Sequence, residues 1–221
     1  MWSAIFLKST TKTHYFQFRN IFSQQYISKS FCIYIIMVAG SLLPVTIHNG
    51  ELYFLFGKEN PLEDSAKGWS DFGGGVEKGE TPYQTALREG GEELTGFLGD
   101  GKTLQKHIRK NGGVYKITHN TYHLHLFYLE YDENLPKYYN QNHRFLWNRM
   151  DVNLLSKTRL FEKIEIGWFS CDDMRKHIKK FRGFYQEIVE KILADKDNVH
   201  DFVEKTCKIS PKNKTLKKRD M

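Results

Sequence analysis

Hydrophobic and polar positions alternate in short runs from residue 37 onward, and turn residues separate the runs. Asn49-Gly50, a dipeptide typical of the two-residue turn of a β-hairpin, joins the first two runs. Asn111-Gly112-Gly113 marks a later turn, after which apolar and polar residues alternate along 122–131. The pattern predicts short strands at 42–48, 52–56, 69–72, 114–118, 122–131 and 164–169.

Helix signals lie between and after these strands. Thr81 followed by Pro82 is typical of an N-cap and a first helical residue, which predicts a helix over 82–94. Two more helices are predicted at 172–180 and 184–194. Strands and helices both contribute, so the predicted fold class is α/β.

The segment 132–162 lacks a clean period and is rich in Asn, Tyr, His and Arg. Long irregular segments of compact domains are usually functional or disordered. We therefore expect an irregular insertion here that contributes to substrate selection.

The length of the chain indicates how many domains it can form, and its charge indicates which partners it favours. The 221 residues suffice for one domain with appendages. Lys and Arg number 33 against 26 Asp and Glu, and the sequence pI of about 9.1 favours polyanionic partners. The stretch from Lys205 onward holds seven Lys or Arg and one Asp, so we expect a basic, solvated tail over 195–221.

The N-terminal segment 1–36 contains four Lys or Arg and no acidic residue. This composition overlaps with that of mitochondrial transit peptides, but an extra strand, a disordered arm or an upstream start site before Met37 fits it too, and we favour these alternatives. The three cysteines are scattered and odd in number, which favours a reducing, cytoplasmic compartment without a disulfide framework or a zinc site. The apolar run 32–45 is too short for a membrane span.

The candidate chemistry lies on the predicted helix 82–94. Glu89, Glu92 and Glu93 are spaced i, i+3 and i+4, so their carboxylates share one helix face. Like charges repel at these spacings, and carboxylate oxygens suit Mg²⁺ or Mn²⁺, so we expect a divalent cation. Glycines at 73–75 allow the backbone to approach it closely. Taken alone, three glutamates would fit a solvated acidic face better than a metal site.

The wider spacing favours the cation. Gly74, five residues, Glu80, seven residues and then Arg88-Glu89-x-x-Glu92-Glu93 closely resembles the signature of the Nudix hydrolases, with every charged position present. Two positions differ: Gly90 stands where the family has a bulky aliphatic residue, and Thr95 where it has glycine. The resemblance implies a Nudix-type α/β/α sandwich with a mixed central sheet over 37–194, interrupted by the insertion at about 132–162.

The resemblance also implies a reaction, the hydrolysis of a nucleoside diphosphate linked to another group by attack of a metal-activated water on phosphorus. It implies Mg²⁺ or Mn²⁺ as cofactor, a salt bridge between Arg88 and Glu80 that orients the helix, and metal ligands at Glu89, Glu92, Glu93 and the carbonyl of Gly73 or Gly74. A further glutamate often completes such sites. Our first choice for it is Glu165, and the second is Glu130.

The substrate is less constrained. The leading hypothesis is mRNA decapping, because the basic balance suits an RNA body and the insertion supplies aromatic and basic residues, namely Tyr138, Tyr139, His143, Arg144, Trp147 and Arg149. The insertion and the Arg-Glu-Gly-Gly-Glu-Glu run also resemble Nudix enzymes of large cytoplasmic DNA viruses, which include decapping and diphosphoinositol-polyphosphate enzymes. The alternative substrates are diphosphoinositol or dinucleoside polyphosphates, with phosphate contacts from Lys106, His107, Arg109, Lys110 and Lys116. A binding module that has lost catalysis is a third hypothesis, against which the intact glutamates argue.

Overall fold

The structure, a computed structural model, describes residues 24–28, 31–35, 37–60, 67–151, 153–154 and 162–209. The strands are β1 (Gln24–Ser28), β2 (Phe31–Ile35), β3 (Ala39–His48), β4 (Glu51–Glu59), β5 (Trp69–Ser70), β6 (Phe72–Gly75), β7 (Val114–His119), β8 (Tyr122–Tyr128) and β9 (Lys163–Ser170). The helices are α1 (Pro82–Glu93), α2 (Gly101–Lys110), α3 (Asn134–Trp147), α5 (Cys171–Lys176), the 3₁₀ helix η2 (Ile178–Lys180), α6 (Tyr185–Ala194) and α7 (Lys196–Ile209).

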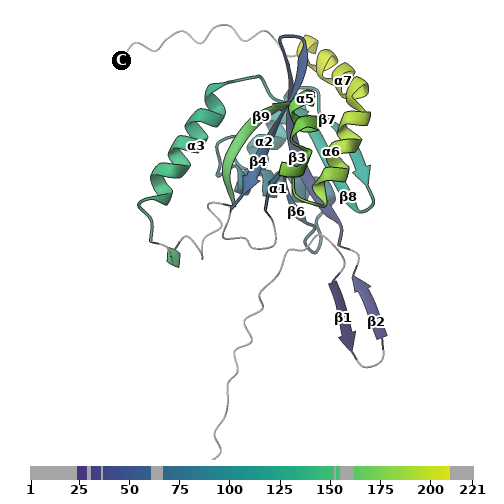
Figure 1. The fold of residues 1–221 in the computed structure, drawn as a ribbon. Helices are drawn as coiled ribbons and strands as arrows, with labels where there is room; N and C mark the ends of the chain where they lie inside the picture. Colours follow the sequence, from purple (N-terminus) through teal and green to yellow (C-terminus); the bar gives the residue numbers. More distant parts are fainter. Residues whose placement is uncertain are drawn as a thin grey trace, which may run out of the picture.

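Seven strands form a mixed sheet in the order β5-β4-β3-β8-β7, with β6 added to β3 and β9 added to β4. β3 and β8 run parallel, whereas β3 and β4 form an antiparallel hairpin. Asn49 and Gly50 join that hairpin with φ angles of 52° and 83°, as the dipeptide predicts. Figure 1 shows α6 and α7 on one side of this sheet and α1 and α2 on the other. The expected α/β/α sandwich with a mixed central sheet is confirmed.

Both faces of the sheet are buried. Along β4, Phe54 and Phe56 contribute to the core cluster that contains α6 and α7, whereas Leu55 contributes to the cluster that contains α1 and α2. A strand covered on both sides is apolar at consecutive positions, which explains the continuous run in the sequence. Val199 and Val203 of α7 are fully buried in the first cluster. The expected basic tail therefore begins as a packed helix, and residues 210–221 lie outside the described part of the chain.

The two glycines in α1 allow close packing. A Cβ on Gly90 would lie 2.8 Å from Cδ1 of Leu42 on β3, and one on Gly91 would lie 3.2 Å from the backbone nitrogen of Gly101 at the start of α2. Each glycine costs about 1 kcal/mol of helix propensity relative to alanine. The departure from the family pattern at Gly90 thus brings the acidic helix closer to the sheet.

The segment 132–162 is not irregular as we expected, because α3 occupies much of it. Among the described strands, β9 pairs with β4 alone, so its other edge needs a partner. Asn140 provides it: its Nδ2 donates to the carbonyl of Ile166 at 3.0 Å, and its Oδ1 accepts from the Ile166 N–H at 2.8 Å. Figure 1 shows α3 running alongside β9. Residues 152 and 155–161 lie outside the described part.

Two further differences concern α2 and the N-terminal segment. The helix α2, with Asp100 as its N-cap, was missed. In the segment 1–36 the structure describes the hairpin of β1 and β2, whereas residues 1–23, 29–30 and 36, and with them the targeting question, lie outside. Within the described ranges, no helix combines the length and apolar character that crossing a bilayer requires.

Candidate active site

The acidic face of α1 meets the start of β9. Glu89 and Glu93 are buried, and each can place a carboxylate oxygen within 4.8 Å of one from Glu162. Carboxylate oxygens are the type of ligand that suits Mg²⁺ or Mn²⁺. Glu92 lies outside this cluster: its side chain is 43% exposed, and its Oε2 is 3.4 Å from Nη1 of Arg88. The three predicted helix glutamates therefore divide into two at the cluster and one at its solvent side.

Glu93 is held from three directions. The Gly73 N–H donates to its Oε2 at 2.8 Å, the Nζ of Lys163 lies 3.6 Å from its Oε1, and the Tyr139 hydroxyl donates to its backbone carbonyl at 3.1 Å. Burial raises the pKa of Glu93 well above its ordinary value, and the nearby carboxylates raise it further, although the ammonium of Lys163 opposes them. A divalent cation would favour the ionised form, so binding should release a proton.

Lys163 is a buried cation directly behind the carboxylate cluster. It donates to Oε1 of Glu59 and, at 2.9 Å, to the hydroxyl of Ser70. Arg182 also donates to Oε1 of Glu59, at 2.9 Å. Burial lowers the pKa of Lys163, but the charges of Glu59 and Glu93 outweigh burial and raise it overall, so Lys163 remains an ammonium.

Arg88 ties the loop before α1 to the acidic face. Its Nε and Nη2 donate to the two carboxylate oxygens of Glu80 at 2.9 and 3.1 Å, and its Nη1 donates to Glu89 at 2.8 Å. The hydrogen bonds from Arg88 lower the pKa of Glu80 to about 2. The guanidinium of Arg88 is thus anchored by Glu80 and in turn orients Glu89.

We predict that Arg88→Ala lowers both stability and rate. Two carboxylates lose charge-assisted hydrogen bonds, which should cost about 2 kcal/mol in the free energy of urea unfolding. The loss of orientation should lower kcat about 10- to 100-fold. Arg88→Lys keeps the positive charge but cannot donate to both Glu80 and Glu89 as the guanidinium does. Its stability and kcat should fall between those of wild type and Arg88→Ala. A lower kcat with unchanged unfolding would contradict the orienting role.

The two glutamates that we expected to complete the site, Glu165 and Glu130, lie outside the carboxylate cluster. Glu165 on β9 has its Oε2 3.3 Å from Nζ of Lys58, and Glu130 is exposed beyond the end of β8. Sequence reasoning missed Glu162, which lies three residues before Glu165. Its position just before the last predicted strand was the signal that could have identified it. Gly73 and Gly74 lie in β6, paired with Ser41 and Gly40 of β3, and Gly73 turns its N–H toward Glu93.

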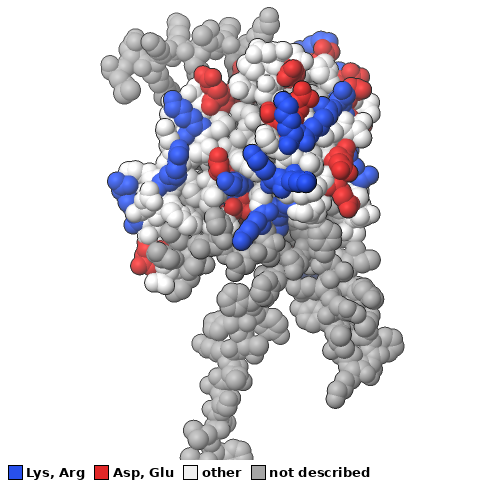
Figure 2. Space-filling model, in the orientation of Figure 1, with Lys and Arg blue, Asp and Glu red and all other residues white. Residues whose placement is uncertain are grey.

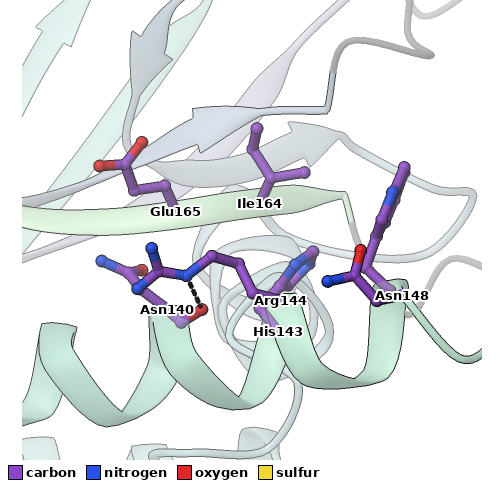
Figure 3. Close-up of a pocket in the computed structure, with 7 residues that line it drawn as sticks. Asn140, His143, Arg144, Asn148, Ile164 and Glu165 are labelled. Atoms are coloured by element: carbon purple, nitrogen blue, oxygen red, sulfur yellow. Dashed lines mark hydrogen bonds between the residues drawn. The ribbon is translucent and has the colours of Figure 1, made fainter.

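The predicted substrate residues of α3 divide between two faces. Tyr139 and His143 are buried, whereas Tyr138 is 56% exposed and the guanidinium of Arg149 lies over the ring of Phe145 at 3.7 Å. A cavity of about 360 Å³ opens between α3 and β9 (Figure 3). Its helix side is formed by His143, Arg144, Trp147 and Asn148, and its strand side by Ile164 and Glu165.

The predicted phosphate contacts on α2 are separate from this cavity. Lys106 and Lys110 are exposed, and neither lines the open groove of about 590 Å³ that runs between α1 and α2 past Arg88 and Glu92. Figure 2 shows basic and acidic side chains interspersed on the face it draws. The positive net charge is therefore not gathered into a single-sign surface on that face.

Comparisons with known proteins place the chain among similar sequences and folds. A sequence model of the NUDIX domain matches residues 41–192, most of the chain. An uncharacterized protein of Acanthamoeba polyphaga mimivirus is 44% identical over 59 residues, which is 26% of this chain and 19% of that protein, so the match spans about a fifth of the relative's length. A mutT/nudix family protein from Listeria innocua is 17% identical with a TM-score of 0.38, covering 76% of this chain and 96% of that one. A C. elegans Ap4A hydrolase is 16% identical with a TM-score of 0.41, covering 75% of this chain and 98% of that one.

Proposed function

Because the chain belongs to the Nudix family of pyrophosphohydrolases, we propose that it cleaves a phosphoanhydride bond at the cluster of Glu89, Glu93 and Glu162. The observation that carries this proposal is the convergence of three carboxylates, within 4.8 Å, from the acidic helix and the start of β9. Two of them are buried, where uncompensated negative charge is costly. A divalent cation would balance that charge and would also attract the phosphates of a substrate.

In the proposed mechanism the chain's own residues bind and orient. Glu89 and Glu93 would hold the cation from α1, Glu92 lies exposed beside Arg88 on the same helix, and the glycine backbone of β6 lies next to Glu93. When bound, Mg²⁺ or Mn²⁺ neutralises phosphate oxygens and makes a water nucleophilic. Arg88 keeps Glu89 in place, and Lys163, next to Glu93, favours its ionised form and partly offsets the effect of burial.

For the additional glutamate we propose Glu162 in place of Glu165. Glu162 belongs to the carboxylate cluster, whereas Glu165 is engaged with Lys58 at the rim of the α3 cavity. Glu162→Gln should therefore lower turnover strongly.

The substrate that we propose is the 5′ cap of mRNA. The net charge of +7 favours a polyanion, and α3 combines aromatic residues with Lys137 and Arg144 and has no acidic residue between Asn134 and Trp147. The likeness to Nudix enzymes of large DNA viruses, drawn from the Arg88–Glu93 run and the 132–162 insertion, agrees with this substrate.

A direct comparison of substrates tests the proposal. Capped RNA, a dinucleoside polyphosphate and a diphosphoinositol polyphosphate would be offered in parallel with Mg²⁺ and with Mn²⁺, and the products separated by chromatography. We expect release of methylated GDP from capped RNA. If capped RNA stays intact while a small polyphosphate turns over, decapping is wrong and the phosphoanhydride hydrolase remains. If none is cleaved, the carboxylate cluster does not support catalysis and the chain is a binding module.

A further inference from the structure

The cavity between α3 and β9 has the volume of a small-molecule site. Its size, about 360 Å³, falls in the range of ligand pockets in proteins. Figure 3 shows Ile164 and Glu165 on the strand side, and Asn140, His143, Arg144 and Asn148 along the facing helix. Asn140 is committed to the backbone of β9, so it fixes the distance between the two walls.

Aromatic rings follow one another along α3 in a regular series that ends at the cavity. The ring centroids of Tyr139 and His143 are 6.0 Å apart with an interplanar angle of 27°, and those of His143 and Trp147 are 6.0 Å apart with an angle of 24°. The three residues are spaced by four, so they follow one another along one face of α3. His143 therefore lies between the rings of Tyr139 and Trp147, and Trp147 is the last ring of the series at the cavity.

The same helix connects the cavity to the carboxylate cluster. The Tyr139 hydroxyl donates to the backbone carbonyls of Glu93, at 3.1 Å, and Lys163, at 2.9 Å. One turn of helix rises about 5.4 Å, so the cavity wall begins next to this anchor at Asn140 and reaches Trp147 about two turns further along α3. On the strand side, Ile164 and Glu165 closely follow Glu162. A substrate with its phosphates at the cluster would extend its next group along this line.

The chemistry of the lining identifies that group. Burial lowers the pKa of His143 to about 4, so its ring is neutral at physiological pH. Of the residues that line the cavity, Arg144 is the one cation, and Glu165 is an acid. An inositol polyphosphate would need several cations and has no aromatic face to stack. A nucleobase has a π-face for the Trp147 ring and polar edges for the Asn148 amide and the Arg144 guanidinium.

We propose that this cavity binds the nucleobase of the substrate, stacked against Trp147. The inference deepens the proposed function, because it selects a nucleotide over an inositol polyphosphate as the molecule cleaved at the cluster. It also makes α3 the element that selects the substrate.

Binding without metal tests the cavity apart from catalysis. Guanosine and adenosine monophosphates would be titrated into the full chain in the presence of a chelator, with inositol hexakisphosphate as the comparison ligand. Trp147→Ala should weaken nucleotide binding about tenfold or more, because a base loses its stacking partner. Trp147→Phe keeps a ring and should restore most of the affinity. Phe145→Ala removes an exposed ring two residues away on the outer face of α3 and should leave the nucleotide affinity unchanged.

Kinetics separate this inference from the proposed function. With a nucleotide substrate, Trp147→Ala should raise KM about tenfold and leave kcat within about twofold of the wild-type value. Equal nucleotide binding by Trp147→Ala and wild type, or binding of inositol hexakisphosphate in preference to both nucleotides, would overturn the cavity assignment even if hydrolysis is normal. Trp147-dependent nucleotide binding in a protein that hydrolyses no phosphoanhydride would uphold the cavity and overturn the proposed function.

Discussion

Glu93→Gln is expected to lower kcat more than about 100-fold and to leave the protein folded. Replacing an outer partner of a metal ligand commonly costs 10- to 100-fold, and this change removes the charge of a proposed ligand itself. Glutamine can still accept the Gly73 N–H, and Lys163 keeps its contact with Glu59. We therefore expect urea unfolding of the metal-free variant within about 1 kcal/mol of wild type. Turnover and urea unfolding, measured on the same preparation, check the expected loss of kcat and the expected retention of stability.

Matched variants locate the effect. Glu162→Gln should also abolish most of the activity, whereas Glu190→Gln, an exposed position on α6 across the sheet, should leave it intact. Calorimetric titration with Mn²⁺ should show weaker binding for the first two variants. Normal turnover in Glu93→Gln would mean that the acidic face of α1 is not the catalytic centre.

The pH dependence of metal binding follows from the pKa of Glu93. Burial raises that pKa, and the cation needs the ionised carboxylate, so affinity should increase as pH rises through the folded-state pKa of this group. Glu93→Gln should flatten the profile. The same measurement therefore reports whether Glu93 is the titrating ligand.

Local signals were sufficient to predict the acidic helix. Thr81 caps α1, Pro82 starts it, and Thr81 and Gln84 complete a capping box, so its position did not depend on distant residues. The spacing of Glu89 and Glu93 followed from helix geometry alone. The β3–β4 hairpin was predictable for the same reason, because Asn49-Gly50 specifies its turn.

The helix α3 and the position of Glu162 could not be predicted from local sequence, because they depend on contacts between distant residues. In α3 the buried positions Tyr139 and His143 follow a narrow stripe spaced by four, and a histidine in that stripe conceals the apolar period. The helix is also held by Asn140 along the edge of β9, a contact across 26 residues. The position of Glu162 at the carboxylate cluster and of Glu165 beside Lys58 reflects the pairing of β9 with β4, whose register shifts at Lys58 and Glu59 and which no local pattern specifies.

Lys163→Met is expected to have the largest effect on stability, a loss of about 3–5 kcal/mol in the free energy of unfolding. The ammonium contacts Glu59 and Glu93, and both carboxylates are buried. Arg182 still reaches Glu59 at 2.9 Å, so most of the uncompensated charge would fall on Glu93. Urea unfolding of the metal-free protein measures the loss. Methionine fills a similar volume, so a cavity would not explain the result.

The pH dependence of this loss distinguishes charge from packing. Without Lys163 the folded-state pKa of Glu93 should rise further above its ordinary value of 4.5. A raised folded-state pKa contributes stability that is present below the unfolded pKa and lost as pH rises through the folded one. The deficit of the variant should therefore be small near about pH 4 and largest near about pH 8. The double variant with Glu93→Gln should recover part of the loss at the higher pH, as expected for directly coupled residues. An equal deficit at both pH values would mean that Lys163 stabilises the fold by packing rather than by its charge.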